Sequence, residues 1–215
     1  MKLTIVYDNE IFTKGIGLQS DWGFACLIET RETTILFDTG ARGDILLGNI
    51  EKLGIDPGII KKIAISHEHG DHNGGLQALA SVVGDVELYR LAKQRPRENM
   101  VLISADDSRK ITEAVYTTGR LKGSVDEQSL VLKGKKGCYV LVGCSHPGVE
   151  DILNVAKKHG GIIGLIGGFH GFNNFNAVQD LDFICPCHCT QHKREIKELY
   201  PQMYTDCGVG KVIEI

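Results

Sequence analysis

The stretch that decides the fold of this chain is Ile65-Ser66-His67-Glu68-His69-Gly70-Asp71-His72. It places three of the eight histidines and one aspartate within a few residues. Side chains two apart in an extended segment point to the same side, so His67 and His69 can face one point. Asp71 and His72 follow where a helix is expected to begin, and they can turn towards a second point. Imidazole and carboxylate are the usual ligands of zinc, iron and manganese, so the loop predicts a metal site.

The alternative is a histidine-rich surface loop without a metal. The close spacing of the ligand types argues against it. So does the position of the loop directly after the apolar segment 59–65, which predicts a buried strand. Binding sites of α/β proteins lie after such strands. Gly74 and Gly75 let the backbone turn tightly behind the ligands.

Length and composition describe an ordinary globular chain. Its 215 residues fit a single domain, 1–215, with 42% hydrophobic and 24% charged residues. A net charge of −3 argues against a nucleic-acid partner, which needs a patterned basic surface. The first residues lack the pattern of a signal peptide, and no apolar run approaches the roughly 20 residues that span a membrane. We expect a cytoplasmic protein with no membrane partner, and its seven cysteines to be reduced.

Apolar periodicity predicts strands and helices along most of the chain. Strands are expected at 4–7, 24–29, 34–37, 59–65, 130–132, 138–142, 161–166, 183–184 and 211–215. Helices are expected at 44–53, with Asp44 as the N-cap, and at 74–82, 148–158 and 191–199. In the helix at 74–82, the predicted inner face consists of Leu76, Leu79 and Ala80. This alternation predicts an α/β fold.

The segment 90–128 is polar and charged. We interpret it as an insertion or a set of long loops over the core, with possible strands at 101–104 and 114–117. It contains four arginines that could bind an anionic group of a substrate, although exposed, solvated arginines are the simpler interpretation. They are Arg95, Arg97, Arg109 and Arg120.

The motif His67-x-His69-x-Asp71-His72 resembles the signature of the metallo-β-lactamase superfamily. The segments Phe37-Asp38-Thr39-Gly40 and Gly74-Gly75 extend the resemblance, which covers nearly the whole chain. It implies a four-layer αββα sandwich. Three later segments resemble the branch named dihydropterin–ribofuranosylaminobenzene phosphate synthases. These are Gly143-Cys144-Ser145-His146-Pro147-Gly148, Gly167-Gly168-Phe169-His170 and Pro186-Cys187-His188-Cys189-Thr190.

The resemblance implies two adjacent metal positions. The first would be held by His67, His69 and His146. The second would be held by Asp71, His72 and His188. One or two divalent ions are expected, with zinc favoured and iron or manganese as alternatives. Asp38 would orient a ligand histidine from behind, and a role as a turn residue or helix cap is the alternative.

His170 departs from the superfamily pattern. Most members place a bridging aspartate after the third histidine segment, but here the strand at 162–166 ends in Gly-Gly-Phe-His. A neutral imidazole offers one free lone pair and cannot bridge two metals as a carboxylate does. His170 could ligate one metal, donate a hydrogen bond to the substrate, or act as an acid or base. We favour a role in the substrate pocket.

Five other histidines and cysteines receive a structural interpretation. His159 and His192 lie in charged helical segments and read as surface histidines. Cys187 and Cys189 alternate with His188 and should point away from the metal. Cys144 could share the side of His146, but the apolar strand before it favours core packing.

The predicted ligand set favours a metal-dependent hydrolase, or a related group-transfer enzyme, acting on a small, anionic substrate. A metal-activated water would attack, with Asp71 and His170 as catalytic residues. Two alternatives remain: an iron-dependent redox protein on the same fold, and a non-catalytic module that senses a metal or ligand. The acidic balance of the chain argues against a nuclease.

Overall fold

The structure is a computed structural model that describes residues 1–94 and 97–215. Arg95, expected as a possible anion-binding residue, lies outside these residues. The described chain divides into two compact units. The first unit consists of Met1–Ala105 and Cys207–Ile215, and the second of Asp106–Asp206. Each unit has one sheet and its own apolar cluster, and the single domain expected from the length stays a prediction.

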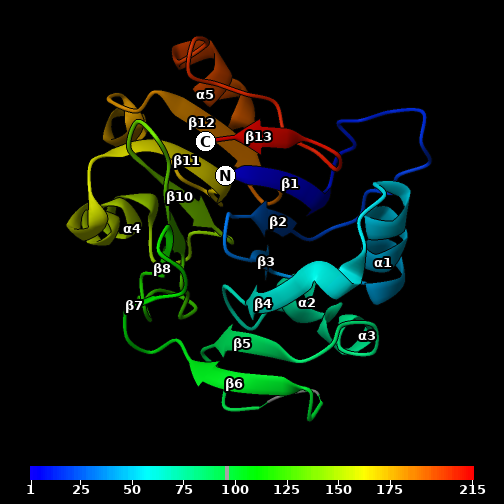
Figure 1. The fold of residues 1–215 in the computed structure, drawn as a ribbon. Helices are drawn as coiled ribbons and strands as arrows, with labels where there is room; N and C mark the ends of the chain where they lie inside the picture. The colour runs from blue at the N-terminus through cyan, green and yellow to red at the C-terminus, as the bar shows by residue number, and fades with distance from the viewer. Residues whose placement is uncertain (95–96) are drawn as a thin grey trace. The chain divides into compact units, whose positions relative to one another are not determined.

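The sheet of the first unit has the strand order β13-β1-β2-β3-β4-β5-β6 (Figure 1). Neighbours from β13 to β3 are antiparallel, and neighbours from β3 to β6 are parallel. The strands are β1 (Lys2–Tyr7), β2 (Ala25–Glu29), β3 (Thr34–Phe37), β4 (Ile60–Ala64), β5 (Val86–Arg90), β6 (Met100–Ser104) and β13 (Val212–Glu214).

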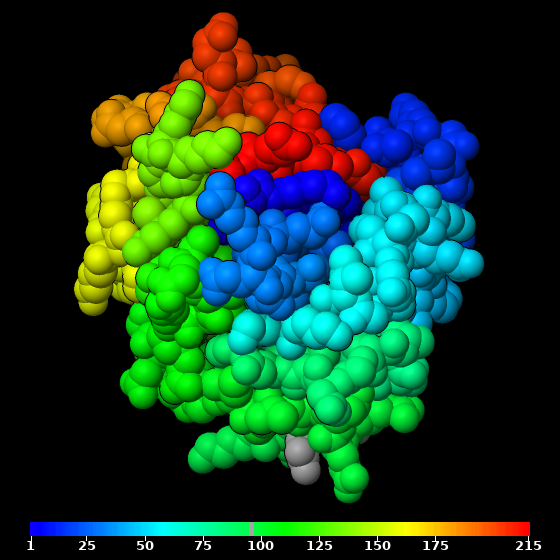
Figure 2. Space-filling model, in the orientation of Figure 1, coloured from blue at the N-terminus to red at the C-terminus, as the bar shows by residue number. Residues whose placement is uncertain are grey.

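The last strand of the chain completes the sheet that the first strand begins. β13 pairs antiparallel with β1, with Leu3 opposite Ile213, and Figure 2 shows the two segments side by side at the surface in red and dark blue. The amino group of Met1 also donates a hydrogen bond to the carbonyl of Ile215 at 2.9 Å. Because β2 and β13 flank it, β1 is an interior strand, and its residues from Leu3 onward are buried.

The helices of the first unit cover its sheet through small apolar faces. They are α1 (Gly43–Lys52), η1 (Pro57–Ile59), α2 (Gly70–Asn73) and α3 (Leu76–Leu79). Leu46 and Ile50 of α1 pack in one cluster with Leu76 and Leu79 of α3 and with Ile63 of β4. The predicted helix at 74–82 is thus shorter than expected. Its predicted inner face is nevertheless buried, at 3% exposure or less.

Asp44 is not the N-cap of α1, which corrects the sequence prediction. The cap position is Arg42, and it makes no side-chain cap hydrogen bond. Asp44 lies in the first turn, where its carboxylate pairs with the Arg42 guanidinium at 2.6 Å. A negative charge in the first turn interacts favourably with the helix dipole without capping the helix. An aspartate near the start of a helix therefore has the same appearance in sequence whether or not it is the N-cap.

The sheet of the second unit has the strand order β12-β11-β10-β9-β8-β7. β10, β11 and β12 are parallel neighbours, and the other pairs are antiparallel. The strands are β7 (Arg109–Lys110), β8 (Val115–Thr117), β9 (Leu130–Lys133), β10 (Cys138–Val142), β11 (Ile162–Gly168) and β12 (Phe183–Cys187). The helices are α4 (Val149–Ala156), η2 (Lys157–His159), η3 (Phe175–Val178) and α5 (Lys193–Leu199). Ile152 of α4 and Ile196 of α5 lie in one cluster with Val140 and Leu165.

The segment 90–128 contains β6, β7 and β8, so strands are present where 101–104 and 114–117 were named as possible strands, and its interpretation as an insertion or long loops stays a prediction. β6 is the edge strand of the first sheet, and β7 and β8 extend the second sheet to its own edge. Edge strands leave part of their side chains in solvent, and most residues of β6 and β7 are at least partly exposed. Polar residues are therefore tolerated there, and the two-residue strand β7 was not expected from the sequence. Within the described residues, no helix combines the length and apolar character needed to cross a membrane.

Candidate metal centre

The predicted ligands follow the carboxyl ends of parallel strands. In the first unit, Asp38 follows β3 and the histidine loop follows β4. In the second unit, His146, His170 and His188 follow β10, β11 and β12 in turn. Parallel neighbours end at the same edge of a sheet, where ligand sites of α/β proteins form. Each unit therefore carries one part of the predicted ligand set.

His67 and His69 converge on one point, as their spacing predicts. The Nε2 atom of His67 lies 3.1 Å from the Nδ1 atom of His69. Two nitrogens bound to one tetrahedral zinc ion at the usual bond length are about 3.3 Å apart, so the pair has the separation that one ion requires. His67 is fully buried. The first unit thus offers two convergent nitrogen ligands.

The carboxylate of Asp38 organises the histidine loop from behind. Its Oδ1 accepts the Ser66 backbone N–H at 2.6 Å, and its Oδ2 accepts the Ser66 hydroxyl at 2.7 Å. The same Oδ2 lies 2.7 Å from His72 Nδ1. All three residues are fully buried. Asp38 therefore has the position expected of a residue that orients a ligand histidine.

These contacts assign the protons of two imidazoles. The Ser66 hydroxyl donates its only proton to Asp38, so at 2.9 Å it accepts from His67 Nδ1–H. His72 Nδ1–H likewise donates to the Asp38 carboxylate. In neutral histidine the other nitrogen then carries the lone pair. Nε2 of both residues is left as a metal-binding atom, which is the usual effect of a carboxylate behind a ligand histidine.

Asp71 lies in the short helix α2, beside His72. Its Oδ2 is 3.8 Å from His72 Nε2, the nitrogen that carries the lone pair. Its backbone carbonyl accepts the Phe24 N–H at 3.2 Å, which ties the loop to the start of β2. An oxygen of Asp71 and a nitrogen of His72 thus lie near each other, and their role as ligands of a second ion stays a prediction.

Glu68 is a supporting residue that sequence reasoning missed. It stands between two ligand histidines, but its carboxylate binds the Arg90 guanidinium at 2.9 and 2.6 Å and accepts from Asn73 Nδ2 at 3.1 Å. Burial would raise the pKa of Glu68, but its hydrogen bond to Arg90 and the charge of that residue lower it below its ordinary value. The pair fixes the outer side of the histidine loop to the end of β5.

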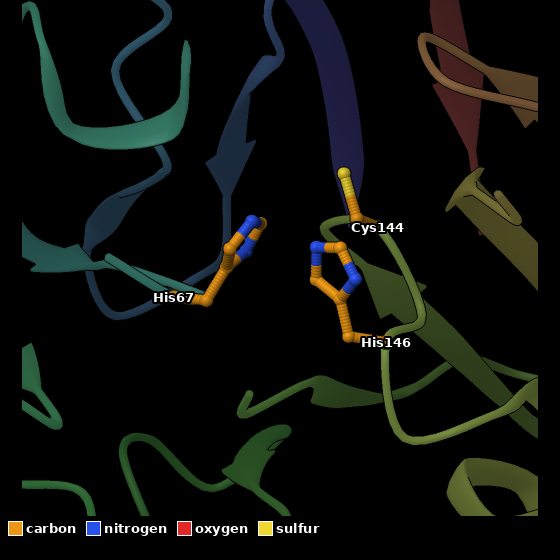
Figure 3. A group of neighbouring side chains, drawn as sticks. All are labelled: His67, Cys144 and His146. Atoms are coloured by element: carbon orange, nitrogen blue, oxygen red, sulfur yellow. The ribbon is translucent and has the colours of Figure 1, made fainter. Parts of the chain in front are cut away.

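The second unit brings His146 together with two neighbours. The ring of His146 lies 5.2 Å from the ring of His170, between centroids. The ligand atom of Cys144 lies within 4.8 Å of a ligand atom of His146 and of one of His188. Figure 3 draws Cys144 and His146 on the loop after β10, and His67 on the loop after β4. Cys144 is buried, as expected of core packing, but its thiol also stands among the histidines and is a ligand candidate.

Four non-glycine residues of the described chain have a positive φ angle, and all four follow strands at the candidate site. They are Asp38 (φ 59°), Ser145 (φ 61°), His170 (φ 46°) and His188 (φ 44°). Left-handed backbone costs about 1–2 kcal/mol for residues other than glycine, and it clusters at functional sites. The strand-to-loop bends here are held by their surroundings: Ser145 Oγ donates to the Gly168 carbonyl at 2.7 Å.

A cavity of about 300 Å³ adjoins His146 within the second unit. Ser145, His146 and Glu150 line it on one side, and Phe172 and Asn174 on the other. The Asn174 side-chain amide donates to Glu150 at 2.9 Å. Small-molecule sites have volumes of about 300–1,000 Å³ and a few placed polar groups, so this cavity has the size for part of a small ligand.

The remaining predicted residues have local roles. Arg120 pairs with Asp106 at 2.7 Å and with Asp126 at 2.8 Å, and Arg109 is exposed on β7. His159 packs on the Tyr116 ring at 4.9 Å, and His192 contacts Glu195 at 3.2 Å. Two thiols beside His188 contact backbone carbonyls: Cys187 reaches that of Cys185 at 3.3 Å, and Cys189 that of Cys144 at 3.9 Å.

Comparison of the sequence and the structure with those of known proteins identifies the fold. The family model of the metallo-beta-lactamase superfamily matches residues 23–121, which include β3, β4 and the histidine loop. The solved structure of a metal-dependent hydrolase of the beta-lactamase superfamily superposes with a TM-score of 0.78 at 25% identity, covering 100% of this chain and 99% of that one. This chain has the metallo-β-lactamase fold. The fold class predicted from the sequence is confirmed.

The predicted resemblance to one branch of the superfamily is also confirmed. A 7,8-dihydropterin-6-methyl-4-(β-D-ribofuranosyl)-aminobenzene-5'-phosphate synthase of Methanocaldococcus jannaschii is 24% identical over 91% of this chain and 90% of its own length. An uncharacterized protein of the same organism is 28% identical, covering 99% of this chain and 100% of its own length. This chain thus matches both relatives over nearly its whole length and theirs.

We predict that Asp38→Asn moves the imidazole proton of both buried histidines, His67 and His72, from Nδ1 to Nε2. An asparagine amide group in place of Oδ2 would donate to His72 Nδ1 or to Ser66, and the Ser66 hydroxyl would then donate to His67 Nδ1. The fold keeps its hydrogen bonds, and asparagine tolerates the left-handed backbone. The protons move to Nε2, the metal-binding atom. Nitrogen-15 NMR of metal-free protein, at a pH where imidazoles are neutral, should show this change of tautomer.

Asp44→Asn is the matched control, because Asp44 is exposed and pairs only with Arg42 in the contacts described above. It should leave both histidines as Nδ1–H tautomers. A folded Asp38→Asn protein with unchanged tautomers would contradict the assignment.

Proposed function

We propose that this protein is a metal-dependent hydrolase, or a related group-transfer enzyme, that acts on a small, anionic substrate. The observation that carries the proposal is the His67–His69 pair, with its nitrogens 3.1 Å apart and the proton of His67 fixed on the opposite side by Ser66. Two imidazole nitrogens at this separation can share a hydrogen bond or, when both carry lone pairs, bind one ion, and the second role is the one proposed here.

In this proposal the predicted ligands form two sets of three. His67 and His69 hold one ion with His146, and Asp71 and His72 hold a second with His188. Nitrogen and oxygen ligands of this kind suit zinc, and they also accept iron or manganese. The Cys144 thiol is an additional ligand candidate, because it lies near both His146 and His188. A soft thiolate at that place favours zinc or iron over manganese.

Such ions, when bound, lower the pKa of a bound water towards about 7 and polarise a carbonyl or phosphoryl oxygen. Asp71 accepts a proton from the attacking water or orients it, because its half-buried carboxylate faces the ligand side of His72. Asp38 and Ser66 hold the protons of the ligand histidines away from the reacting atoms.

His170 acts in the substrate pocket in this proposal. It is exposed, it stands beside His146, and the neighbouring cavity opens between the loops that follow β10 and β11. From there it can donate a hydrogen bond to the substrate or a proton to the leaving group. Glu150 and Asn174 would bind hydrogen-bond donors of the substrate, so its anionic group would point away from them, towards the metal.

The relatives support both halves of the proposed reaction class. The similar solved structure is described as a metal-dependent hydrolase, and the curated relative is named a synthase. A hydrolase and a group-transfer enzyme can share one site, because they differ in whether water or another nucleophile attacks. We also propose that the protein acts in the cytoplasm on small molecules, in line with its composition.

We predict that His67→Ala and His188→Ala each lose most of the metal that the unaltered protein retains after dialysis. One histidine comes from each unit, so the pair tests whether both contribute. His192→Ala is the control, since His192 contacts Glu195 at the surface. Elemental analysis of protein purified without added metal measures content and identity. Full metal content in both variants would refute the proposed ligand set.

The same samples test catalysis. We expect turnover of at least one probe among carboxylic esters, phosphodiesters and thioesters, its loss after chelation, and its return on adding Zn²⁺, Mn²⁺ or Fe²⁺. Fully loaded protein that turns over none of them would refute the enzyme proposal and favour the metal-sensing module.

We predict that His170→Ala lowers kcat by about 10²–10⁴-fold while metal content stays unchanged, because general acid–base or hydrogen-bonding groups contribute on this scale. Steady-state kinetics and elemental analysis on the same preparation distinguish the roles. Loss of metal from His170→Ala would show that His170 is a ligand instead.

A further inference from the structure

The hairpin 121–127 packs against the loop that carries His146. Its two ends pair as an antiparallel bridge: Leu121 N–H donates to the Glu127 carbonyl at 2.8 Å, and Glu127 N–H donates back at 3.1 Å. At its tip, a Cβ atom on Gly123 would lie only 2.5 Å from the His146 carbonyl oxygen. A side chain at position 123 would therefore push the two backbones apart, and glycine permits the close approach.

The carboxylate of Glu127 holds the backbone of the His146 loop. Its Oε1 accepts the N–H groups of Gly143, Cys144 and Ser145 at 3.0, 2.9 and 3.1 Å. Its Oε2 accepts the N–H of His146 at 2.9 Å. Glu127 is fully buried. Hydrogen bonds to a charged acceptor are about twice as strong as neutral ones, so four of them fix this loop firmly.

The loop needs such an acceptor. Consecutive N–H groups converge because Ser145 has a left-handed backbone, with φ at 61°. Converging N–H groups form a concave site for an anion, and a buried N–H without a partner costs about 1–3 kcal/mol. Glu127 supplies that anion from within the chain. The strained backbone of Ser145 and the carboxylate of Glu127 are thus two parts of one arrangement.

The same hairpin also contacts the ring of His146. Ser124 Oγ lies 3.5 Å from His146 Nδ1, a long hydrogen bond. A hydroxyl can donate to Nδ1 or accept from it, so this contact restrains the orientation of the ring without selecting its tautomer. Backbone and ring of His146 are therefore both contacted by one short segment.

We infer that the 121–127 hairpin is a positioning device for the metal ligand His146, in which Glu127 fixes the backbone and Ser124 orients the ring. The inference rests on the proposed function, because it takes His146 to be a ligand. Glu127 acts through the loop and is a positioning residue. It lies in the segment 90–128, which was interpreted from the sequence as an insertion or a set of long loops.

Glu127→Gln tests the backbone contact with little change of shape. An amide has one oxygen, so at least one of the four N–H groups must face the NH₂ group. Metal affinity should fall by about 10–100-fold, the range for residues that support ligands, and the visible spectrum of the Co²⁺-loaded protein should change. In metal-free protein, amide hydrogen exchange within 143–146 should become faster. Glu113→Gln is the matched control, because Glu113 is an exposed glutamate in the same unit that pairs with Lys110.

Ser124→Ala tests the contact with the His146 ring. It also tests the positioning role of the hairpin if Glu127→Gln does not fold. Loss of one weak hydrogen bond should reduce affinity for Zn²⁺ by about two- to fivefold. His146→Ala, measured in the same chelator competition, reports on the proposed function. If His146→Ala keeps the unaltered affinity, the proposed function fails. Suppose that His146→Ala loses the metal but folded Glu127→Gln keeps both the affinity and the Co²⁺ spectrum of the unaltered protein. Only the positioning inference is then overturned. Where Glu127→Gln is unfolded, an unchanged affinity and spectrum in Ser124→Ala have the same meaning.

Discussion

Buried carboxylates bound to backbone N–H and imidazole N–H groups are the constraint on which the candidate site depends. Asp38 holds Ser66 and His72, and Glu127 holds four consecutive N–H groups up to His146. A carboxylate removed from water is costly unless its hydrogen bonds are made, so each of these residues favours one local arrangement of its loop. The ligand geometry then follows from the position of the carboxylate more than from the ligands themselves.

This constraint explains what the sequence could and could not reveal. The histidine loop could be recognised because its predicted ligands lie close together in the sequence and follow an apolar strand. Asp38 was readable because it ends a strand within a familiar motif. Glu127 was not, because nothing in the residues around it distinguishes a buried glutamate from a solvated one: its partners are backbone N–H groups almost twenty residues away, which have no signature in sequence.

The errors have physical causes of the same kind. Asp44 lies in the first turn of α1, where a carboxylate is hard to distinguish from an N-cap in sequence. The edge strand β7 is exposed and has two residues, so it lacks the apolar run by which β4 and β10 were found. Cys144 is both buried and close to two histidines, and sequence reasoning could weigh only its burial. Strands in the interior of a sheet follow the apolar periodicity of the sequence. Edge strands, helix caps and loops depend on contacts between residues that are far apart in the sequence.

The pairing of β13 with β1 has a consequence for how the chain is made. The first unit cannot complete its sheet until the whole of the second unit has left the ribosome, because Val212–Glu214 comes last. Throughout synthesis, β1 is an apolar strand with one unpaired edge, the kind of edge that attracts other strands and leads to aggregation. The second unit, which is continuous in sequence, can form its sheet without waiting. Nascent chains of this protein are thus most in need of chaperone protection along β1, far in sequence from the residues that finally cover it.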